Sequence, residues 1–379
     1  MNILYLIDPN SIHDQKWIRK FTNNPANNCF FICREHYYNY HFIKQFEIDF
    51  QISFVGTVDY FSFKKLFGSI KQVIRIKRTI NEYEIELFNI QYAEPNALWA
   101  LFRELFGIPI IITCRGTDVL KTIPNHFRQK DIFNKLIAWA YKKSFLNASW
   151  ITVTSKGQWD SLNKLIGSKK EISIIRTGID LKGLRNDTSA FLPKEVCKSY
   201  ILFPRYIKPI YNHEFAIEAL KKLPTELKQK YQMVFVGKNS GDLRYQNLLI
   251  CSLKEDEAID FLFLEKQGQE AIWELYKNAE LIIMTPKSDG SPVSGMEAIA
   301  LHKKLILGPL EYDKDVFSQP NVFPLEDWNS QELSSLIEKL INIDGYEAKQ
   351  SPIYLKKIDN KDNMQLLQEI YNKVIETTQ

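Results

Sequence analysis

The sequence contains no apolar run that approaches the roughly 20 residues needed to cross a bilayer. Its five cysteines are scattered, and the only close pair, Cys29 and Cys33, has no second Cys/His pair to complete a zinc site. The six histidines are dispersed without ligand spacing, and the net charge of +4 is too small for a general nucleic-acid binder. These absences favour a cytoplasmic protein with buried, reduced thiols, no metal site and no nucleic-acid partner.

The length of 379 residues is about twice a common domain size, which predicts two domains. A composition of 45% hydrophobic and 25% charged residues is ordinary for a globular protein, so each half can bury its own core. The opening segment, Met1–Asp8, is too short and too weakly charged for a secretory signal. We expect it to form a first buried strand.

Short apolar strands alternate with longer helical stretches along nearly the whole chain. The strands are predicted at Ile3–Ile7, Cys29–Cys33, Ile85–Ile90, Pro109–Thr113 and Trp150–Val153, then at Tyr200–Phe203, Met233–Val236, Ile259–Leu264, Leu281–Thr285 and Lys304–Leu307. Helices between them include Ala97–Phe106, Ile132–Phe145, Glu214–Leu223, Gln269–Ala279 and Pro292–Leu301. This alternation predicts an α/β protein with two Rossmann-like parallel-sheet domains that face each other across a cleft.

The alternation is interrupted between Gly178 and Lys198, where polar residues and turn formers predominate. We therefore expect residues 1–180 to form a first domain, residues 181–198 a linker and residues 199–360 a second domain. Residues 361–379 are expected to form a helix that packs back on the first domain. Ligands of such sheets bind outside the carboxyl ends of the strands, so the candidate site residues are those that follow strands.

The segment after the strand that ends at Thr285 carries the strongest signal for a ligand. Asp289 and Gly290 favour a tight turn, Ser291 suits the N-cap of a helix and Pro292 its first position. A helix that begins at the carboxyl edge of a sheet is a ready anion site. We therefore expect a pyrophosphate to bind at the backbone of Gly290, Ser291, Pro292, Val293 and Ser294. The proline has no N–H group, so the other four residues would supply the hydrogen bonds.

Glu297 lies inside the predicted helix between apolar neighbours, Met296 on one side and Ala298 and Ile299 on the other. A buried carboxylate without a partner would cost several kcal/mol, so Glu297 needs donors, and the vicinal hydroxyls of a ribose would serve. Asp289, on the turn, would then reach a sugar beyond the phosphates. The alternative is that Asp289 only makes a turn and that Glu297 pairs internally with a lysine.

The spacing from Asp289 to Glu297 resembles the E-x7-E donor motif of family-four retaining glycosyltransferases, with Asp in the first acidic position. Three further segments resemble elements of that family in the same order: Ile175–Asp180, Val234–Gly237 and Glu274–Leu281. The resemblance covers most of the chain and implies the GT-B fold. It also implies a metal-independent, hexosyltransferase-like enzyme without a cofactor, which uses a nucleotide-diphosphate sugar as donor.

The resemblance also assigns cations to the donor site. Arg205 falls where the family keeps a phosphate-binding arginine, and Lys208 stands near the position of a lysine that usually follows. Gly237 and Lys238, at the end of a predicted strand, complete the donor-binding set. Such cations would stabilise the charge of the departing nucleoside diphosphate. An ordinary surface ion pair is the alternative for Arg205.

The first half is expected to hold the acceptor. The loop that contains Arg115 and Asp118 resembles the family's "RGSD" loop, which faces the acceptor and the donor sugar. The alternative is an Arg115–Asp118 pair that only braces a turn. His13 stands where many relatives carry a glycine-rich loop, and it either touches a substrate or is a helix-start histidine without a ligand.

Two other segments invite a functional interpretation. Asp313 and Asp315 fit the D-x-D metal motif of the other major glycosyltransferase fold, but three-residue matches arise by chance and we expect no metal there. Phe61–Arg78 predicts a helix with apolar residues on one face and six positive charges, which suits a weak contact with an anionic membrane. An ordinary domain helix with a basic outer side is the alternative.

These expectations together describe a retaining glycosyltransferase of cell-surface polysaccharide or glycolipid synthesis. Its acceptor would be a glycan or a lipid-linked sugar, and the protein would be cytoplasmic or peripheral at the inner face of the membrane. Two alternatives stay open. One is a nucleotide-sugar epimerase of the same fold, and the other is a catalytically silent sugar-binding or scaffold homologue.

Overall fold

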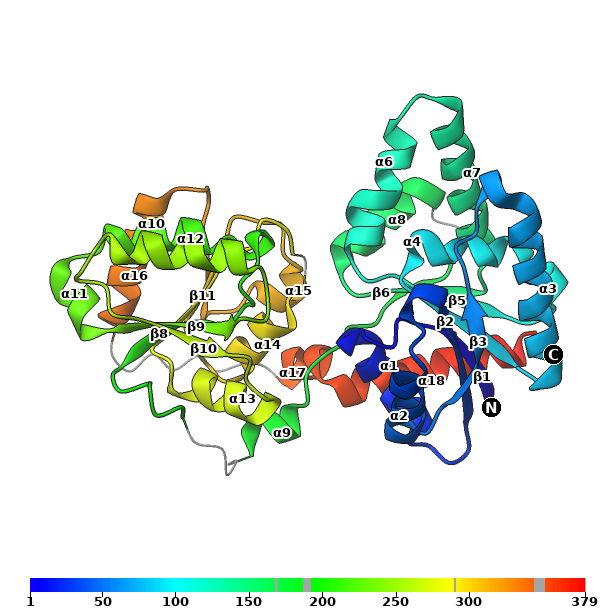
Figure 1. Ribbon diagram of the computed structural model, residues 1–379, viewed down its shortest axis with the longest axis horizontal. Helices are drawn as coiled ribbons and strands as arrows, with labels where there is room; N and C mark the ends of the chain where they lie inside the picture. The colour runs from blue at the N-terminus through cyan, green and yellow to red at the C-terminus, as the bar shows by residue number, and fades with distance from the viewer. Residues whose placement is uncertain (168–169, 187–191, 290, 344–351, 379) are drawn as a thin grey trace. The chain divides into compact units, whose positions relative to one another are not determined.

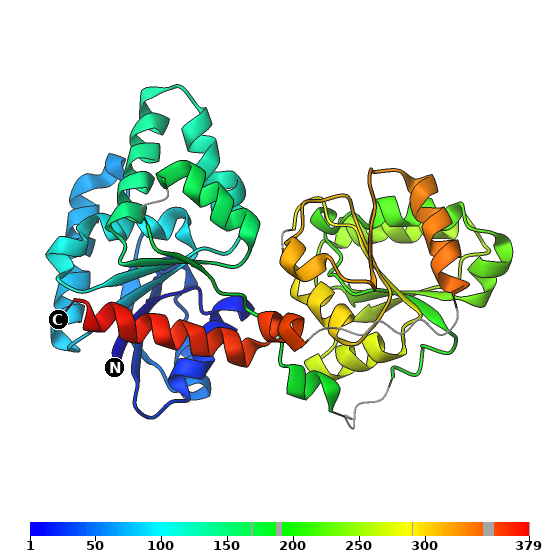
Figure 2. The same ribbon diagram turned by 180° about the vertical axis from the view of Figure 1, so that it is seen from behind.

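The computed structural model describes residues 1–167, 170–186, 192–289, 291–343 and 352–378 (Figures 1 and 2). The chain divides into two compact units, of which the first comprises Met1–Thr177 with Lys361–Gln379 and the second Gly178–Asn360. Each unit is a parallel sheet with helices on both faces, which confirms the α/β prediction. No helix in the described parts of the chain is long and apolar enough to span a membrane.

The first unit contains a seven-stranded sheet in the order β3-β2-β1-β4-β5-β6-β7. Its strands are β1 (Asn2–Leu6), β2 (Asn28–Arg34), β3 (Ser53–Val58), β4 (Leu87–Gln91), β5 (Ile110–Thr113), β6 (Trp150–Val153) and β7 (Ile172–Ile174). The helices are α1 (Ile12–Thr22), α2 (Tyr40–Phe50), α3 (Leu66–Glu82), α4 (Ala93–Asn96), α5 (Arg103–Phe106), α6 (Ile123–Arg128), α7 (Ile132–Asn147), α8 (Lys156–Ile166) and α18 (Asn360–Glu376). The 3-10 helices are η1 (Glu35–Tyr37), η2 (Phe63–Lys65) and η3 (Ala97–Phe102), and η4 (Asp118–Thr122) is a π-helix.

Alternate residues of the central strands enter two different cores of the first unit. Leu4 and Leu6 of β1 join one core with α3, α7 and α8, whereas Ile3 and Tyr5 join the other core with α1, α2 and α18. Both faces of the sheet are therefore apolar, as expected of a parallel sheet that is covered on each side. Both views show α18 lying along this unit, so the last helix contributes to the first unit's core.

The second unit contains a six-stranded sheet in the order β10-β9-β8-β11-β12-β13. Its strands are β8 (Tyr200–Phe203), β9 (Gln232–Lys238), β10 (Phe261–Glu265), β11 (Leu281–Met284), β12 (Leu305–Leu307) and β13 (Val322–Pro324). The helices are α9 (Leu181–Arg185), α10 (His213–Lys221), α11 (Thr225–Lys230), α12 (Leu243–Lys254), α13 (Gln269–Asn278), α14 (Val293–Ala300), α15 (Lys314–Phe317), α16 (Ser330–Ile341) and α17 (Pro352–Ile358), with the turn η5 (Pro209–Tyr211). Two cores again lie on the two faces of the sheet.

The chain enters and leaves the second unit at one point. Ile179 donates to the carbonyl of Ile358 at 2.8 Å, and Asn360 donates to the carbonyl of Ile179 at 2.9 Å. Gly178 has a positive φ of 64°, and a Cβ there would lie 2.7 Å from the backbone nitrogen of Asn360. Glycine is therefore required where the two crossing segments meet.

The ten predicted strands are present, and the structure adds β3, β7 and β13, which are edge strands of the two sheets. Of the predicted helix over residues 97–106, the first part is the 3-10 turn η3 and only the last part is α5. The polar stretch 181–198, predicted as a linker, lies in the second unit. It begins with α9, whose Leu181 and Leu184 enter that unit's core.

Three cysteines are buried as expected, but Cys197 and Cys251 are exposed, so the prediction of uniformly buried thiols was wrong. Cys251 lies on the outer side of α12, where the helical period turns it away from the core. Burial raises the pKa of Cys29 and of Cys33 to about 12. These two thiols are therefore inert at neutral pH.

Candidate active site

Three residues that are predicted to bind the sugar nucleotide meet at the carboxyl edge of the second unit's sheet. Arg205, which follows β8, donates from Nη1 to Oγ of Ser294 on α14 at 2.9 Å. Its Nη2 lies 3.1 Å from Oδ2 of Asp289, which follows β11. The guanidinium also lies 4.2 Å from the ring centroid of Tyr211, a contact that the sequence does not predict. Arg205 therefore forms an ion pair, but the pair is mostly buried rather than at the surface, and its partner is another candidate residue of the site.

The helix after Asp289 begins later than predicted. Pro292 is the N-cap, the first helical residue is Val293 and no side chain caps the end, so the assignment of Ser291 as N-cap was wrong. The backbone of Pro292 is extended, with ψ of 122°, which excludes it from the helix. As first residues of α14, Val293 and Ser294 have backbone N–H groups without an acceptor inside the helix. Gly290 lies outside the described residues.

Glu297 is buried in α14, with 7% of its surface exposed. Its Oε1 accepts hydrogen bonds from Nε2 of Gln269 and from Nε1 of Trp273, each at 3.0 Å. Both donors are neutral and come from α13, which packs beside α14. They fix the orientation of the carboxylate. Neither carries the positive charge of the lysine that was considered above as an alternative partner of Glu297.

The other donor-side candidates lie at the same edge of the sheet. Gly237 has a positive φ of 98°, and a Cβ there would lie 2.6 Å from Cδ1 of Tyr206, so the end of β9 packs closely against the loop after β8. Lys238 follows and is partly exposed. Lys208 is exposed just before η5, and in the described residues its side chain forms no hydrogen bond or ion pair with Arg205 or Asp289.

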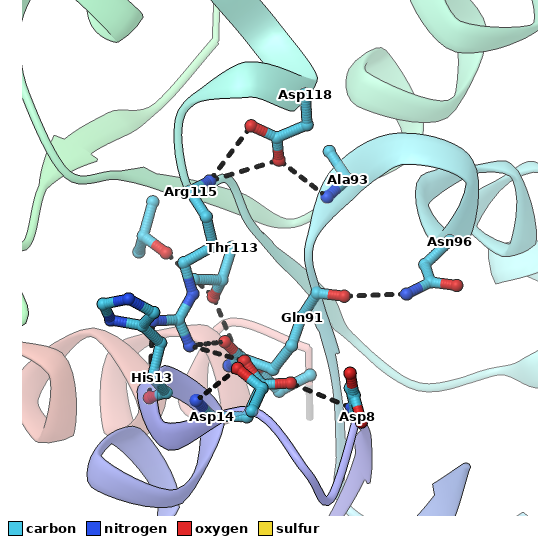
Figure 3. Close-up of polar contacts among 12 residues, drawn as sticks. Asp8, His13, Asp14, Gln91, Ala93, Asn96, Thr113, Arg115 and Asp118 are labelled. Carbon is cyan, nitrogen blue, oxygen red and sulfur yellow. Dashed lines mark hydrogen bonds and ion pairs between the residues drawn. The ribbon is translucent and has the colours of Figure 1, made fainter. Parts of the chain in front are cut away.

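In the first unit, Arg115 follows β5 and turns toward the start of α1 (Figure 3). Its Nη2 lies 3.2 Å from Oδ1 of Asp14 and also donates to Oε1 of Gln91, and Nη1 donates to the carbonyl of His13 at 3.5 Å. The guanidinium lies 4.6 Å from the ring of Trp17. Burial lowers the pKa of Arg115 and raises that of Asp14, while the opposite charges of the two groups counter both shifts.

Asp118 points away from the Arg115 side chain and into the protein (Figure 3). Its carboxylate accepts from the backbone N–H groups of Ala93 at 2.9 Å, Gly116 at 2.8 Å and Val119 at 3.0 Å, and from that of Arg115. Burial raises the pKa of Asp118, and these four hydrogen bonds oppose the shift. Asp118 thus stabilises its own turn and connects this turn to the loop after β4. It contacts Arg115 through the backbone N–H group of that residue and not through the guanidinium.

His13 is the second residue of α1, and its side chain is exposed. The loop before it is closed by polar side chains: Asn10 N–H donates to Oδ1 of Asp8 at 2.9 Å, and Oγ of Ser11 accepts from the N–H of Asp14 at 3.2 Å. Oδ2 of Asp14 accepts from the N–H of Asp8 at 2.9 Å. These bonds hold the turn after β1 in a shape that needs no glycine.

The D-x-D residues have structural partners. Asp313 is the N-cap of α15 and accepts from the N–H of Asp315 at 3.3 Å. Asp315 lies 3.8 Å from Nζ of Lys357. Among the residues that the structure describes, no group of three or more His, Cys, Asp or Glu side chains could hold a metal ion.

Two family models match the chain, one for each half. Residues 185–354 match the model of glycosyl transferases group 1. Residues 2–155 match the model described as glycosyl transferase 4-like. No curated protein matches the sequence.

Solved structures share the whole two-unit fold. Anabaena Alr3699/HepE in complex with UDP is 16% identical, with a TM-score of 0.74 over 98% of this chain and 100% of that chain. A glycosyltransferase from Rickettsia africae ESF-5 is 16% identical, with a TM-score of 0.72 over 99% and 98%. The UDP-GlcNAc 2-epimerase from Neisseria meningitidis is 14% identical, with a TM-score of 0.61 over 98% and 100%. At such identities the likeness shows the fold alone.

Both family matches name the same activity, and together they extend over most of the chain. With the two parallel-sheet units, they identify the protein as a glycosyltransferase of the GT-B fold.

Proposed function

We propose that the protein is a retaining glycosyltransferase that takes its sugar from a nucleoside-diphosphate sugar bound at the second unit. The observation that carries the proposal is the meeting of Arg205, Asp289 and the first turn of α14 at one sheet edge, with Glu297 buried one helical turn further on. Structures of the similar HepE hold UDP, UDP with glucose, and UDP-glucose. They support a uridine nucleotide as the first donor to test.

The diphosphate would lie between Arg205 and the N–H groups of Val293 and Ser294, where the helix dipole adds to the attraction. Arg205 would then exchange its partner Asp289 for a phosphate oxygen. This exchange would leave the Asp289 carboxylate available for hydroxyls of the transferred sugar. Glu297, oriented by its two neutral donors, would accept hydrogen bonds from the ribose.

The charge that develops on the leaving diphosphate would be stabilised by Arg205, with Lys208 and Lys238 as further cations at the same edge. These protein cations would supply the stabilisation without a metal ion. Gly237 would allow the close packing that brings Lys238 to this edge.

The acceptor would bind at the carboxyl edge of the first unit's sheet. His13 presents an exposed ring there, and Arg115 is fixed beside it by Asp14. Asp118 would act through the turn that it braces rather than by touching the acceptor, because its carboxylate is filled by backbone donors. A glycan or lipid-linked acceptor of polysaccharide or glycolipid synthesis is the proposed class.

A lipid-linked acceptor would require contact with a membrane surface, and α3 supports this part of the proposal. Of the predicted apolar face, Leu66, Phe67, Ile70 and Ile74 are exposed, with 88% of Phe67 accessible. Val73 is buried together with Ile76 on the side toward the core. Exposed basic residues flank the apolar ones: Lys64, Lys65, Lys71, Arg75 and Arg78. The protein would thus be cytoplasmic and weakly peripheral at an anionic leaflet.

One experiment tests the activity against its rivals. The protein is incubated with UDP-glucose, UDP-N-acetylglucosamine or GDP-mannose, and the products are separated and identified. Slow release of the free sugar with its original anomeric configuration supports a retaining transferase. Release with inverted configuration contradicts retention. An isomerised sugar nucleotide would indicate the epimerase, and the absence of any product from every donor would indicate a silent homologue.

A further inference from the structure

A buried tyrosine that the sequence does not single out lies beside the proposed donor site. Tyr312 is in the segment after β12, whose end is joined to that of β11 by a 2.9 Å hydrogen bond from Gly308 N–H to the carbonyl of Met284. Only 9% of Tyr312 is exposed. Its ring packs against that of Phe317, with centroids 5.5 Å apart. Phe317 in turn lies against Gly295 of α14, where a Cβ would come within 2.8 Å of its ring.

The hydroxyl of Tyr312 is buried and has no hydrogen-bond partner within the part of the chain that the structure describes. Burial raises its pKa, the Asp289 carboxylate adds to this shift and the Arg205 guanidinium opposes it. The geometry that links Tyr312 to the donor site is its ring contact with Phe317, which lies against Gly295 of α14, the helix that follows Asp289. A buried hydroxyl without a partner destabilises a protein, whereas a phenylalanine ring would fill the same space without that cost.

We infer that the Tyr312 hydroxyl forms a hydrogen bond with a hydroxyl of the transferred sugar and is a specificity-determining contact of the donor site. The inference rests on the proposed function. The sugar is favoured over the diphosphate because the Tyr312 segment follows β12, the strand paired with β11, and Asp289, the residue proposed to bind the sugar, follows β11. The diphosphate side of the site already has the donors of Arg205 and α14. Donors that present a hydroxyl at this point would be preferred over those that lack it.

The test compares Tyr312→Phe with the wild type in two measurements. Calorimetry gives affinities for the preferred sugar nucleotide among UDP-glucose, UDP-N-acetylglucosamine and GDP-mannose, and for the matching nucleoside diphosphate. We expect affinity for the sugar nucleotide to fall about 3- to 10-fold while that for the diphosphate stays within twofold. The melting temperature of the free variant should equal or exceed that of the wild type, because the substitution removes an unsatisfied hydroxyl.

Tyr200→Phe is the matched control, because the Tyr200 hydroxyl is also buried but donates to the carbonyl of Leu275 at 2.7 Å. It should lower the melting temperature and leave the ratio of the two affinities unchanged. The inference is overturned if Tyr312→Phe weakens both ligands equally, weakens neither, or melts earlier than the wild type. If the wild type binds none of these nucleotides, the proposed function itself fails, which is a separate outcome.

Discussion

At the scale of single residues, the contact between Arg205 and Asp289 joins the residue proposed to bind the diphosphate to the residue proposed to bind the sugar. The pair is about one-fifth exposed, at 19% and 17% of the two side chains, so it is neither screened like a surface pair nor sealed like a core pair. In the proposed mechanism an incoming diphosphate, which carries more negative charge than Asp289, would replace it. The pair would then balance the charges of the site while no donor is bound and would separate when one binds.

Arg205→Ala should reduce turnover about 100-fold at saturating donor, because the guanidinium is proposed to stabilise charge on the leaving diphosphate. Steady-state kinetics of donor hydrolysis or transfer measure this effect. Lys208→Ala is the comparison, since Lys208 is exposed and forms no ion pair with Asp289 in the described residues, and it should lose much less. If Lys208→Ala lost more turnover than Arg205→Ala, stabilisation of the leaving diphosphate would be assigned to Lys208 instead.

Glu297→Gln should weaken nucleotide binding by about 1.5–3 kcal/mol, the range for a hydrogen bond to a charged group. The amide oxygen can still accept from Gln269 and Trp273, so the melting temperature should change little. Calorimetry with the free nucleoside diphosphate measures the loss. Wild-type affinity in a correctly folded variant would contradict the assignment of Glu297 to the ribose.

The role of Glu297 as a buried carboxylate could be predicted from the apolar residues around it in the sequence. The role of Asp118 could not, because its partners include Ala93, whose N–H group reaches it only once β4 and β5 lie side by side. The pairing of Arg115 with Asp14 has the same origin, since it joins the loop after β5 to the first turn of α1, about 100 residues away. Contacts between residues that are far apart in the sequence cannot be predicted from the spacing of residues within a short segment.

At the scale of elements, the apolar residues of α3 form two stripes with different surroundings. One stripe, with Val73 and Ile76, enters the core, and a second stripe with Phe67 and Ile70 faces solvent between basic residues. The sequence predicts the amphipathic character of the helix. The sequence does not show which apolar residues of α3 are buried and which are exposed, because both stripes follow the same helical period.

The charges on α3 should decide whether the protein binds vesicles. The wild type should sediment with anionic vesicles at low salt and be released at high salt, because each juxtamembrane basic residue contributes about 1 kcal/mol. Replacement of Lys64, Lys71, Arg75 and Arg78 by Gln should abolish sedimentation and spare donor hydrolysis. The matched control replaces four exposed basic residues of the second unit by Gln: Lys230, Arg244, Lys254 and Lys339. Equal losses in both variants would indicate only a general charge effect.

At the scale of the whole molecule, the alternation of strands and helices predicts two parallel sheets, and ten strands follow from apolar runs. The three that do not are edge strands, such as β7, whose residues are all only partly buried. An edge strand needs one covered face and fewer apolar residues, so its signal is weak.

The two units should respond to acid with opposite signs. His213 in the second unit is buried, and burial lowers its pKa from 6.5 to about 4. Since the unfolded chain binds the proton first, the second unit should lose stability as pH falls from about 6.5 toward 4, by up to roughly 3 kcal/mol. Asp14 and Asp118 in the first unit have raised pKa values, so their effect is destabilising at neutral pH and disappears as pH falls toward 3.8.

Hydrogen exchange followed by mass spectrometry, corrected for the intrinsic effect of pH, resolves the two units within one chain. Between pH 7 and pH 5, peptides from β8, β9 and β11 should lose protection, while peptides from β1, β4 and β5 should keep or gain it. His213→Gln should remove the loss in the second unit and leave the first unit unchanged, because glutamine does not titrate. If protection in the second unit falls equally in this variant, another group is responsible for its acid sensitivity.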